Sequence, residues 1–281
     1  EPDRATRSVE QFVEYLSNWY VRRSRRRFWK AGMLGPEGSG GDVDKLGAYA
    51  TLYECLVTTV KLLAPFMPFV AESMYGNLVG STGNGAESVH LDSYPEADPA
   101  LIDSDLAEDT RLAMRLSSMG RAARSKAGIK VRQPLANVLV KLPTSAESER
   151  LVRIAPQLKD ELNIRRVDSL DRESDVLEYT IRPNTSLLGP KYGAEMSKIA
   201  SALSAADAGE VSHRVNGGGG VEVDGYSLEP DEVLVTGSDR DGYSVASEGG
   251  YTVAVTTAIT PELASEGLAR ELVHRIQNMR R

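Results

Sequence analysis

The sequence predicts a multidomain chain, α then α+β, in which an all-α helical bundle comes first. Apolar residues recur at helical spacing through the first third of the chain. After Gly128, short runs of alternating hydrophobicity appear between glycine-rich turns. The length of 281 residues suits one large domain or two to three small ones, and a hydrophobic content of 41% can supply their cores. We predict the bundle at residues 1–128, a small α/β unit at 129–183 and a C-terminal α+β module at 184–281.

The first predicted helix carries a single apolar stripe, and Ser8 is its expected N-cap. The stripe consists of Val9, Phe12, Val13, Leu16 and Tyr20. A glycine-rich loop follows at 35–41, and a second helix is predicted over 46–64. Pro65 should stop that helix, and Pro68 suits the first turn of the next. A third long helix is predicted at 101–127, with Gly128 just past its end.

The mixed parts are predicted from shorter signals. Strands are predicted at residues 138–142, 165–170, 176–182, 221–223, 232–236 and 251–256. Helices are predicted at 146–162 and 195–204, and Pro156 is expected to interrupt the first of them. Thr260 is a good N-cap and Pro261 suits the first helical position, so the chain should close in a helix.

The charges of the chain are segregated, although its net charge is −7. From Arg22 to Lys30 there are six positive residues and no acid, and residues 110–141 carry eight positive residues and no acid. Residues 92–109 are the reverse, with seven acids and no Lys or Arg. Such segregation permits one face of an acidic protein to bind a polyanion.

Several classes of function find no support in the residues. Cys55 is the single cysteine, which excludes an internal disulfide and a cysteine-based zinc site and fits a reducing, cytoplasmic setting. No apolar run approaches the length of a membrane-spanning helix. The histidines, His90, His213 and His274, lie far apart and beside no nucleophile. We therefore predict no catalytic residue and no metal site in this chain.

The segment at 16–30, which contains the basic run at 22–30, is the most informative part of the sequence. On a regular helix Arg23 and Arg27 continue the apolar stripe, Arg22 and Arg26 lie on its flank, and Arg25 lies on the far side. At least one of the two arginines in line with the stripe should then be partly buried against a carboxylate of the same bundle. Planar guanidinium groups suit phosphates, and the neighbouring aromatic residues can pack in a core or stack on unpaired bases.

The same segment closely resembles the opening of the anticodon-binding bundle in isoleucine–tRNA synthetases. The matching residues are Leu16-Ser17-Asn18-Trp19-Tyr20-Val21-Arg22-Arg23 and Arg25-Arg26-Arg27-Phe28-Trp29. Other stretches resemble this family in the same order, namely Thr51-Leu-Tyr-Glu54, Leu63-Ala-Pro-Phe-Met-Pro-Phe69, Ser88-Val-His-Leu91, Lys130-Val-Arg-Gln-Pro-Leu135, Asp160-Glu-Leu-Asn163, Leu188-Gly-Pro-Lys191, Glu266-Gly-Leu-Ala-Arg-Glu-Leu272 and Arg275-Ile-Gln277. Leucine and valine ligases share a similar bundle, but the Ser-Asn-Trp-Tyr-Val-Arg-Arg run looks like the isoleucine branch.

The resemblance implies a parent enzyme that joins isoleucine to its tRNA with ATP and Mg²⁺, while this fragment supplies tRNA binding and holds no cofactor. The His-Ile-Gly-His and Lys-Met-Ser-Lys-Ser catalytic signatures are absent, so the catalytic site is expected upstream. The four-cysteine C-terminal zinc module of one bacterial branch is absent too, which resembles the other branch. The implied partners are isoleucine tRNA and the upstream catalytic and editing domains of the same chain. We expect a cytoplasmic monomer with no membrane association.

The resemblance and the charge pattern together suggest a set of RNA-binding residues. They are Asn18, Trp19, Arg22, Arg23, Arg25, Arg26, Arg27, Lys30, Arg121, Arg124, Lys130 and Arg132. Two other classes of function stay open on the sequence. One is a freestanding RNA-binding module, and the other is a structural assembly domain whose arginines pair with the acids of residues 92–109.

Overall fold

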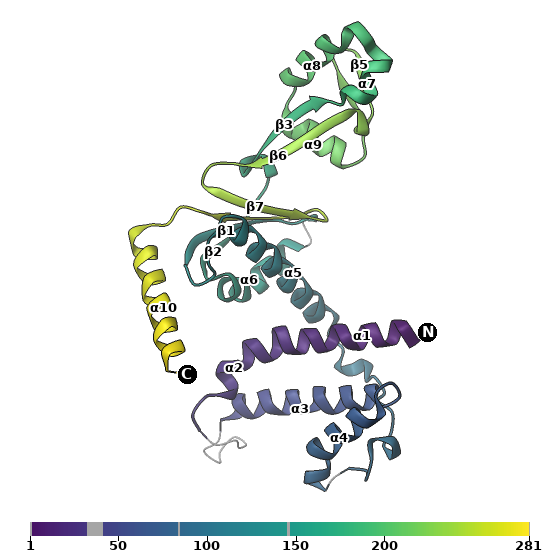
Figure 1. Ribbon diagram of the computed structural model, residues 1–281, viewed down its shortest axis with the longest axis vertical. Helices are drawn as coiled ribbons and strands as arrows, with labels where there is room; N and C mark the ends of the chain where they lie inside the picture. Colours follow the sequence, from purple (N-terminus) through teal and green to yellow (C-terminus); the bar gives the residue numbers. More distant parts are fainter. Residues whose placement is uncertain (1, 33–41, 84, 145–146, 281) are drawn as a thin grey trace. The chain divides into compact units, whose positions relative to one another are not determined.

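The computed structural model describes residues 2–32, 42–83, 85–144 and 147–280 (Figure 1). The chain divides into two compact units, of which the first ends at Ile102 and the second begins at Asp103. The loop predicted at 35–41 lies outside the described residues.

The first unit is helical, as predicted for this part of the chain. Its longer elements are α1 (Pro2–Tyr15), η1 (Leu16–Val21), α2 (Arg22–Phe28), α3 (Val43–Leu63) and α4 (Pro68–Leu78). Three 3₁₀ turns follow at Gly80–Thr82, Val89–Leu91 and Pro99–Leu101. The predicted N-cap at Ser8 is wrong, because α1 already begins at Pro2 and the Ser8 hydroxyl, inside the helix, donates to the carbonyl of Arg4.

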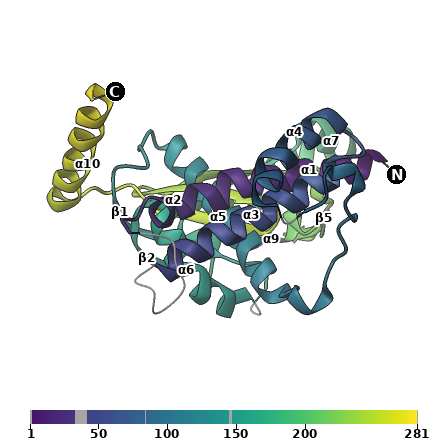
Figure 2. The same ribbon diagram turned by 90° about the horizontal axis from the view of Figure 1, so that it is seen from below.

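The core of the first unit lies between α3, α4 and the turn that follows them. Asp42 caps α3 by accepting a hydrogen bond from the Lys45 backbone N–H. The helix ends before Pro65, and Pro68 opens α4, which confirms both predictions. Tyr75 is buried in this core, and its hydroxyl donates to Asp92 over 2.6 Å. The chain from α1 to α2 runs alongside α3 (Figure 1 and Figure 2).

One turn of this helical run, η1 (Leu16–Val21), is π-helical. A π turn holds more residues than the 3.6 of an α turn. The residues that face the core after such a turn therefore lie later in the sequence than a regular α-helix would place them. Ser24 and Phe28 are therefore buried below Leu16, and Arg23 and Arg27 are only half-buried beside them. The prediction that these two arginines continue the apolar stripe was wrong by one position.

The second unit is built on a four-stranded sheet with the strand order β2-β1-β8-β7. Its strands are β1 (Leu135–Lys141), β2 (Ile164–Ser169), β7 (Tyr243–Glu248) and β8 (Tyr251–Thr256). The crossover helix α6 (Ser148–Leu162) joins the parallel strands β1 and β2, and β8 pairs antiparallel with β1. The long helix α5 (Ser104–Lys126) packs against α6 and the sheet (Figure 1). Asp103 caps α5, and Gly128 follows it with a φ of 68°, as predicted.

The remaining elements of this unit enclose a second, smaller core. They are β3 (Leu177–Pro183), α7 (Thr185–Tyr192), α8 (Met196–Ala205), α9 (Ala208–Asn216), β4 (Val221–Val223), β5 (Tyr226–Leu228) and β6 (Val233–Asp239), with 3₁₀ turns at Glu173–Asp175, Gly193–Glu195 and Pro230–Glu232. Leu188, Ile199, Leu203 and Leu228 are buried at its centre. The chain closes in α10 (Pro261–Met279), where Thr260 Oγ1 accepts from the Leu263 N–H as predicted.

The strand pairing differs from the predicted domain boundaries. β1 pairs with β8, which lies more than a hundred residues later, and β3 pairs with β6 across residue 183. The helix α5, predicted as part of the bundle, belongs to the second unit. Partners this distant in sequence leave no local signal, so the boundaries at 128 and 183 could not be read from periodicity.

Two local predictions in the second unit also needed correction. Helix α6 runs through Pro156 without a break, because Leu151, Ile154 and Leu158 hold its buried face to the core. The lost hydrogen bond to the Val152 carbonyl falls where that residue is exposed. Helices α7 and α9 had not been predicted, since one contains Pro190 and the other is short and polar.

Candidate nucleic-acid interface

The buried stripe of the basic segment decides which arginines face solvent. Leu16, Ser24 and Phe28 anchor η1 and α2 in the first unit. Arg22, Arg25 and Arg26 consequently lie on the exposed side of the helix. Tyr20 adds to this anchoring, because its hydroxyl donates a hydrogen bond of 2.9 Å to the carbonyl of Ala48, which lies in α3. Three guanidinium groups are thus presented from a helix that is fixed on its other side.

Two arginines of this segment lie over indole rings. The guanidinium carbon of Arg23 is 5.1 Å from the ring centre of Trp19, and that of Arg25 is 5.8 Å from the ring of Trp29. Trp29 is 79% exposed, and its ring is the most exposed of this segment. Asn18 is also exposed, and its backbone carbonyl accepts from Arg22 Nε over 2.8 Å. An exposed indole beside a cation has the chemistry of a stacking surface for an unpaired base.

The remaining cations of the segment pair with the start of α3. Arg27 Nε donates to Asp44 Oδ1 over 2.8 Å, and Lys30 Nζ lies 2.5 Å from Asp42 Oδ2. The hydrogen bond to Asp42 raises the pKa of Lys30, and the same bond lowers the pKa of Asp42. This confirms the prediction that at least one of Arg23 and Arg27 is partly buried against a carboxylate of the same helical part. Because the Arg27–Asp44 pair is half-exposed, its contribution to stability is at most about 1 kcal/mol.

The prediction that Arg124 binds RNA was wrong, because its side chain is fully buried in the second unit. Its Nη1 donates to the Leu162 carbonyl over 3.1 Å, and its Nη2 donates to the Lys130 carbonyl over 2.6 Å and to the Gln133 carbonyl. Burial lowers the pKa of Arg124 to about 10, so it stays charged at neutral pH. This guanidinium joins α5 to the end of α6 and to the turn before β1.

The other cations predicted in the second unit are accessible. Arg121 is half-exposed and donates from Nη1 to the buried carboxylate of Glu161 over 2.9 Å. Lys130 and Arg132 are exposed on the turn that Arg124 holds, and both lie beside Glu271 of α10. The role of these cations in RNA binding stays a prediction. The sequence could not show that the counter-ion of Lys130 and Arg132 comes from a helix some 140 residues away.

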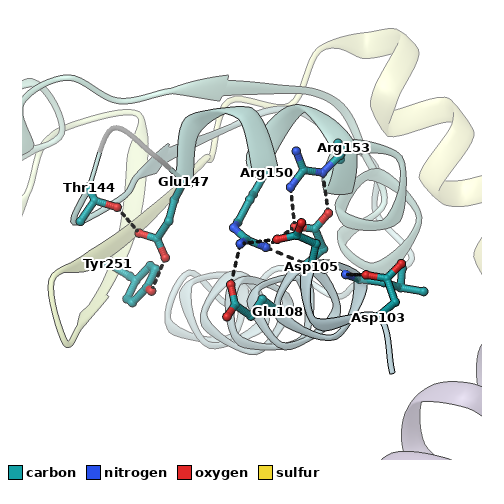
Figure 3. A network of polar contacts seen from close by, with 10 residues as sticks. Asp103, Asp105, Glu108, Thr144, Glu147, Arg150, Arg153 and Tyr251 are labelled. Carbon is teal, nitrogen blue, oxygen red and sulfur yellow. Dashed lines mark hydrogen bonds and ion pairs between the residues drawn. The ribbon is translucent and has the colours of Figure 1, made fainter. Parts of the chain in front are cut away.

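The acids of residues 92–109 have partners other than the basic segment. Figure 3 shows Arg150 and Arg153 of α6 reaching the acids at the start of α5. Arg153 Nε donates to Asp109 Oδ2 over 2.6 Å, and Arg150 Nη1 donates to Asp109 Oδ1 over 2.9 Å. At the other end of the acidic stretch, Asp92 lies 2.9 Å from Lys61. The structural alternative, in which these acids neutralise the arginines at 22–30, is not needed to explain them.

No group of three or more histidine, cysteine and acidic side chains able to hold a metal occurs in the described part of the chain. Within the same residues, no helix is long and apolar enough to span a membrane. His274 lies beside Arg132 at 2.9 Å, and His90 and His213 are in other elements. The features of chemical interest are therefore exposed cations and indole rings.

Comparison with known proteins places these features in a family. A family model described as the anticodon-binding domain of tRNA ligase matches residues 1–140. Isoleucine–tRNA ligases match nearly the whole chain, with 42% identity in Deinococcus radiodurans over 98% of the chain and 41% in Thermus thermophilus over all of it. The chain spans 25% and 27% of those two relatives, respectively. The chain belongs to the anticodon-binding family of the tRNA ligases, and its similarity is to the isoleucine enzymes.

Proposed function

We propose that this chain is the tRNA-binding part of an isoleucine–tRNA ligase and that it recognises the anticodon stem-loop of isoleucine tRNA. One observation carries the proposal. The buried stripe of Leu16, Ser24 and Phe28 turns the other side of α2 toward solvent. Arg22, Arg25 and Arg26 are exposed on that helix, and Arg25 lies over the indole of Trp29. Arginine forks bind phosphates, and an aromatic ring stacks on bases, so the two together suit a single-stranded RNA loop.

The ligase reaction itself belongs to the rest of such an enzyme. This chain spans about a quarter of its relatives, and the catalytic signatures are absent from it. Catalytic and editing domains of the same polypeptide would supply ATP-dependent, Mg²⁺-dependent aminoacylation, and we propose a monomer that works in the cytoplasm. The chain alone would contribute affinity and anticodon discrimination.

We expect the chain to bind isoleucine tRNA with an affinity that falls steeply with salt. Four to six phosphate contacts predict a slope of about −3 to −5 in a plot of log K against log salt. The double variant Arg25→Gln with Arg26→Gln should raise the Kd and make the slope shallower by about 1.5, because two phosphate contacts are lost. Filter binding or fluorescence anisotropy at several salt concentrations measures both quantities.

A matched control for this variant lies on α1. Arg4→Gln with Arg7→Gln removes two exposed charges from the same unit, away from α2. If both double variants weaken binding equally, the attraction is diffuse and α2 holds no specific site. If a tRNA with a changed anticodon binds as tightly as the isoleucine tRNA, the chain is a non-specific RNA anchor and the proposal fails.

Trp29→Ala tests the stacking part of the proposal. Stacking on a base contributes about 1–3 kcal/mol to binding, so the Kd should rise by roughly fivefold to a hundredfold. The slope against salt should stay the same, because no charge is removed. The melting temperature should also be nearly unchanged, since the ring is largely exposed. Trp29→Phe keeps an aromatic ring and should recover most of the affinity; if it behaves like alanine, the ring does not stack.

A further inference from the structure

The second unit carries four arginines and one lysine that lie together around α10. They come from the turn before β1, from β2 and from α10 itself. We refer to Lys130, Arg132, Arg165, Arg270 and Arg275 as the α10 cationic surface. Lys130 and Arg132 lie on the turn before β1, Arg165 lies on the edge strand β2, and the last two lie on α10. We propose that this surface binds phosphates of the tRNA backbone, as a second contact in addition to the one made by α2. The proposal rests on the proposed function.

Two carboxylates of α10 hold these five cations in place. Glu266 lies between Arg165 and Arg270, with Arg270 Nη2 at 2.8 Å from Oε1. Glu271 faces Arg132 at 3.2 Å and Lys130 and Arg275 each at 3.7 Å. Burial alone would raise the pKa of Glu271, but the charges of Lys130 and Arg132 outweigh it and the pKa is lowered. Glu271 therefore stays ionised at neutral pH and holds Lys130, Arg132 and Arg275 around it.

The seven side chains carry an excess of three positive charges, and the excess is on the outside. Lys130 and Arg275 are 71% and 73% exposed, while the carboxylate of Glu271 between them is 25% exposed. A guanidinium has five N–H donors in a fixed plane, and each of these arginines uses only some of them on Glu266 or Glu271. The unused donors of the exposed side chains are available to an external anion.

Hydrogen bonds made by two amide side chains also hold the surface together. Asn163, at the end of α6, donates from Nδ2 to the carbonyls of Val131 and Arg132, each over 3.0 Å. Its Oδ1 accepts from Arg270 Nη1 over 2.6 Å, so a single amide links the turn to α10. Gln133 Nε2 donates to the Leu263 carbonyl over 2.7 Å. The cations thus project from a rigid backbone, which reduces the entropy lost when they bind a ligand.

The charge and chemistry of the surface favour RNA over an acidic protein segment. Four of the five cations are arginines, whose planar forks match phosphate oxygens. The two carboxylates set fixed spacings between the cations, which suits a ligand with regularly repeated charges. The chain also belongs to a family of tRNA-binding domains, so the polyanion is one that the protein already meets.

The test uses the full chain and an isoleucine tRNA transcript. Lys130→Gln with Arg275→Gln removes the two most exposed charges of the surface and should leave the fold intact. We expect the Kd to rise about tenfold at 0.1 M salt and the log–log slope to become shallower by about 1.5. Arg172→Gln with Arg214→Gln is the matched control, because both arginines are exposed in the same unit and each pairs with an acid three or four positions away in sequence. Circular dichroism verifies that each variant is folded.

Each outcome separates this inference from the proposed function. Loss of affinity in the surface variant and in the Arg25/Arg26 variant supports both. If only the Arg25/Arg26 variant loses affinity, the α10 cationic surface is not an RNA site. If only the surface variant loses affinity, this inference stands and the site on α2 falls. Equal competition by polyglutamate at the same charge concentration would overturn the inference in favour of an acidic protein partner.

Discussion

Arg124→Ala should destabilise the second unit by about 4 kcal/mol, the largest effect that we expect from a single substitution. The fully buried guanidinium donates to the backbone carbonyls of Leu162, Lys130 and Gln133. Alanine would leave three carbonyls without this donor and open a cavity in the core. The melting temperature of this unit should fall by about 10 °C, as measured by circular dichroism.

Two further variants make the reason for this loss measurable. Arg111→Ala removes an exposed arginine from the same helix and should change stability by less than about 0.5 kcal/mol. Arg124→Lys keeps the charge but not the planar fork, so it should recover only part of the stability. If the melting temperature of Arg124→Ala equals that of the Arg111→Ala control, the three carbonyls have other donors and the Arg124 guanidinium does not stabilise the unit.

Asp109→Asn should cost about 3 kcal/mol, because it breaks the best-buried ion pair between α5 and α6. The Asp109 carboxylate is 12% exposed and accepts hydrogen bonds from both Arg150 and Arg153. An amide has one acceptor oxygen and no charge, so Arg153 would lose its ionised partner and Arg150 would lose one of the three acids around it. We place the cost at the lower end for a buried pair, since the Arg153 side chain is half-exposed.

The same carboxylate should contribute to the loss of stability in acid. The hydrogen bond from Arg153 is the main cause that lowers the pKa of Asp109 below its ordinary value of 3.8, against the opposing effect of burial. A lowered pKa in the folded state means that the contribution is complete above pH 3.8 and is lost as the pH falls through the folded-state pKa. Urea unfolding between pH 6 and pH 3 should therefore show a shallower loss of stability for Asp109→Asn than for the parent chain.

Asp105→Asn is the matched control for this pair. Asp105 also meets Arg150, but its side chain is 83% exposed, so the change should stay below about 1 kcal/mol. Equal losses for the two variants would mean that burial does not set the strength of the network shown in Figure 3.

Local sequence determined most of the elements and the chemistry of the exposed residues. The stops at Pro65 and Gly128 and the cap at Thr260 follow from backbone conformations that these residue types favour or forbid, so they could be predicted one at a time. The segregated charges and the basic aromatic segment at 16–30 pointed to RNA before any contact was known. The resemblance that they carry covers nearly the whole chain, as the relatives confirm.

The tertiary structure decided which arginines are exposed to solvent and which strands pair. The π turn at Leu16–Val21 moved the buried stripe to Ser24 and Phe28, a shift that an assumed period of 3.6 residues cannot reveal. Arg124 and Lys130 lie in one run of positive charge in the sequence, yet one is fully buried and the other is exposed. Burial, counter-ions and strand partners depend on residues more than a hundred positions away, such as β8 for β1 and Glu271 for Arg132, and no local pattern records such distant contacts.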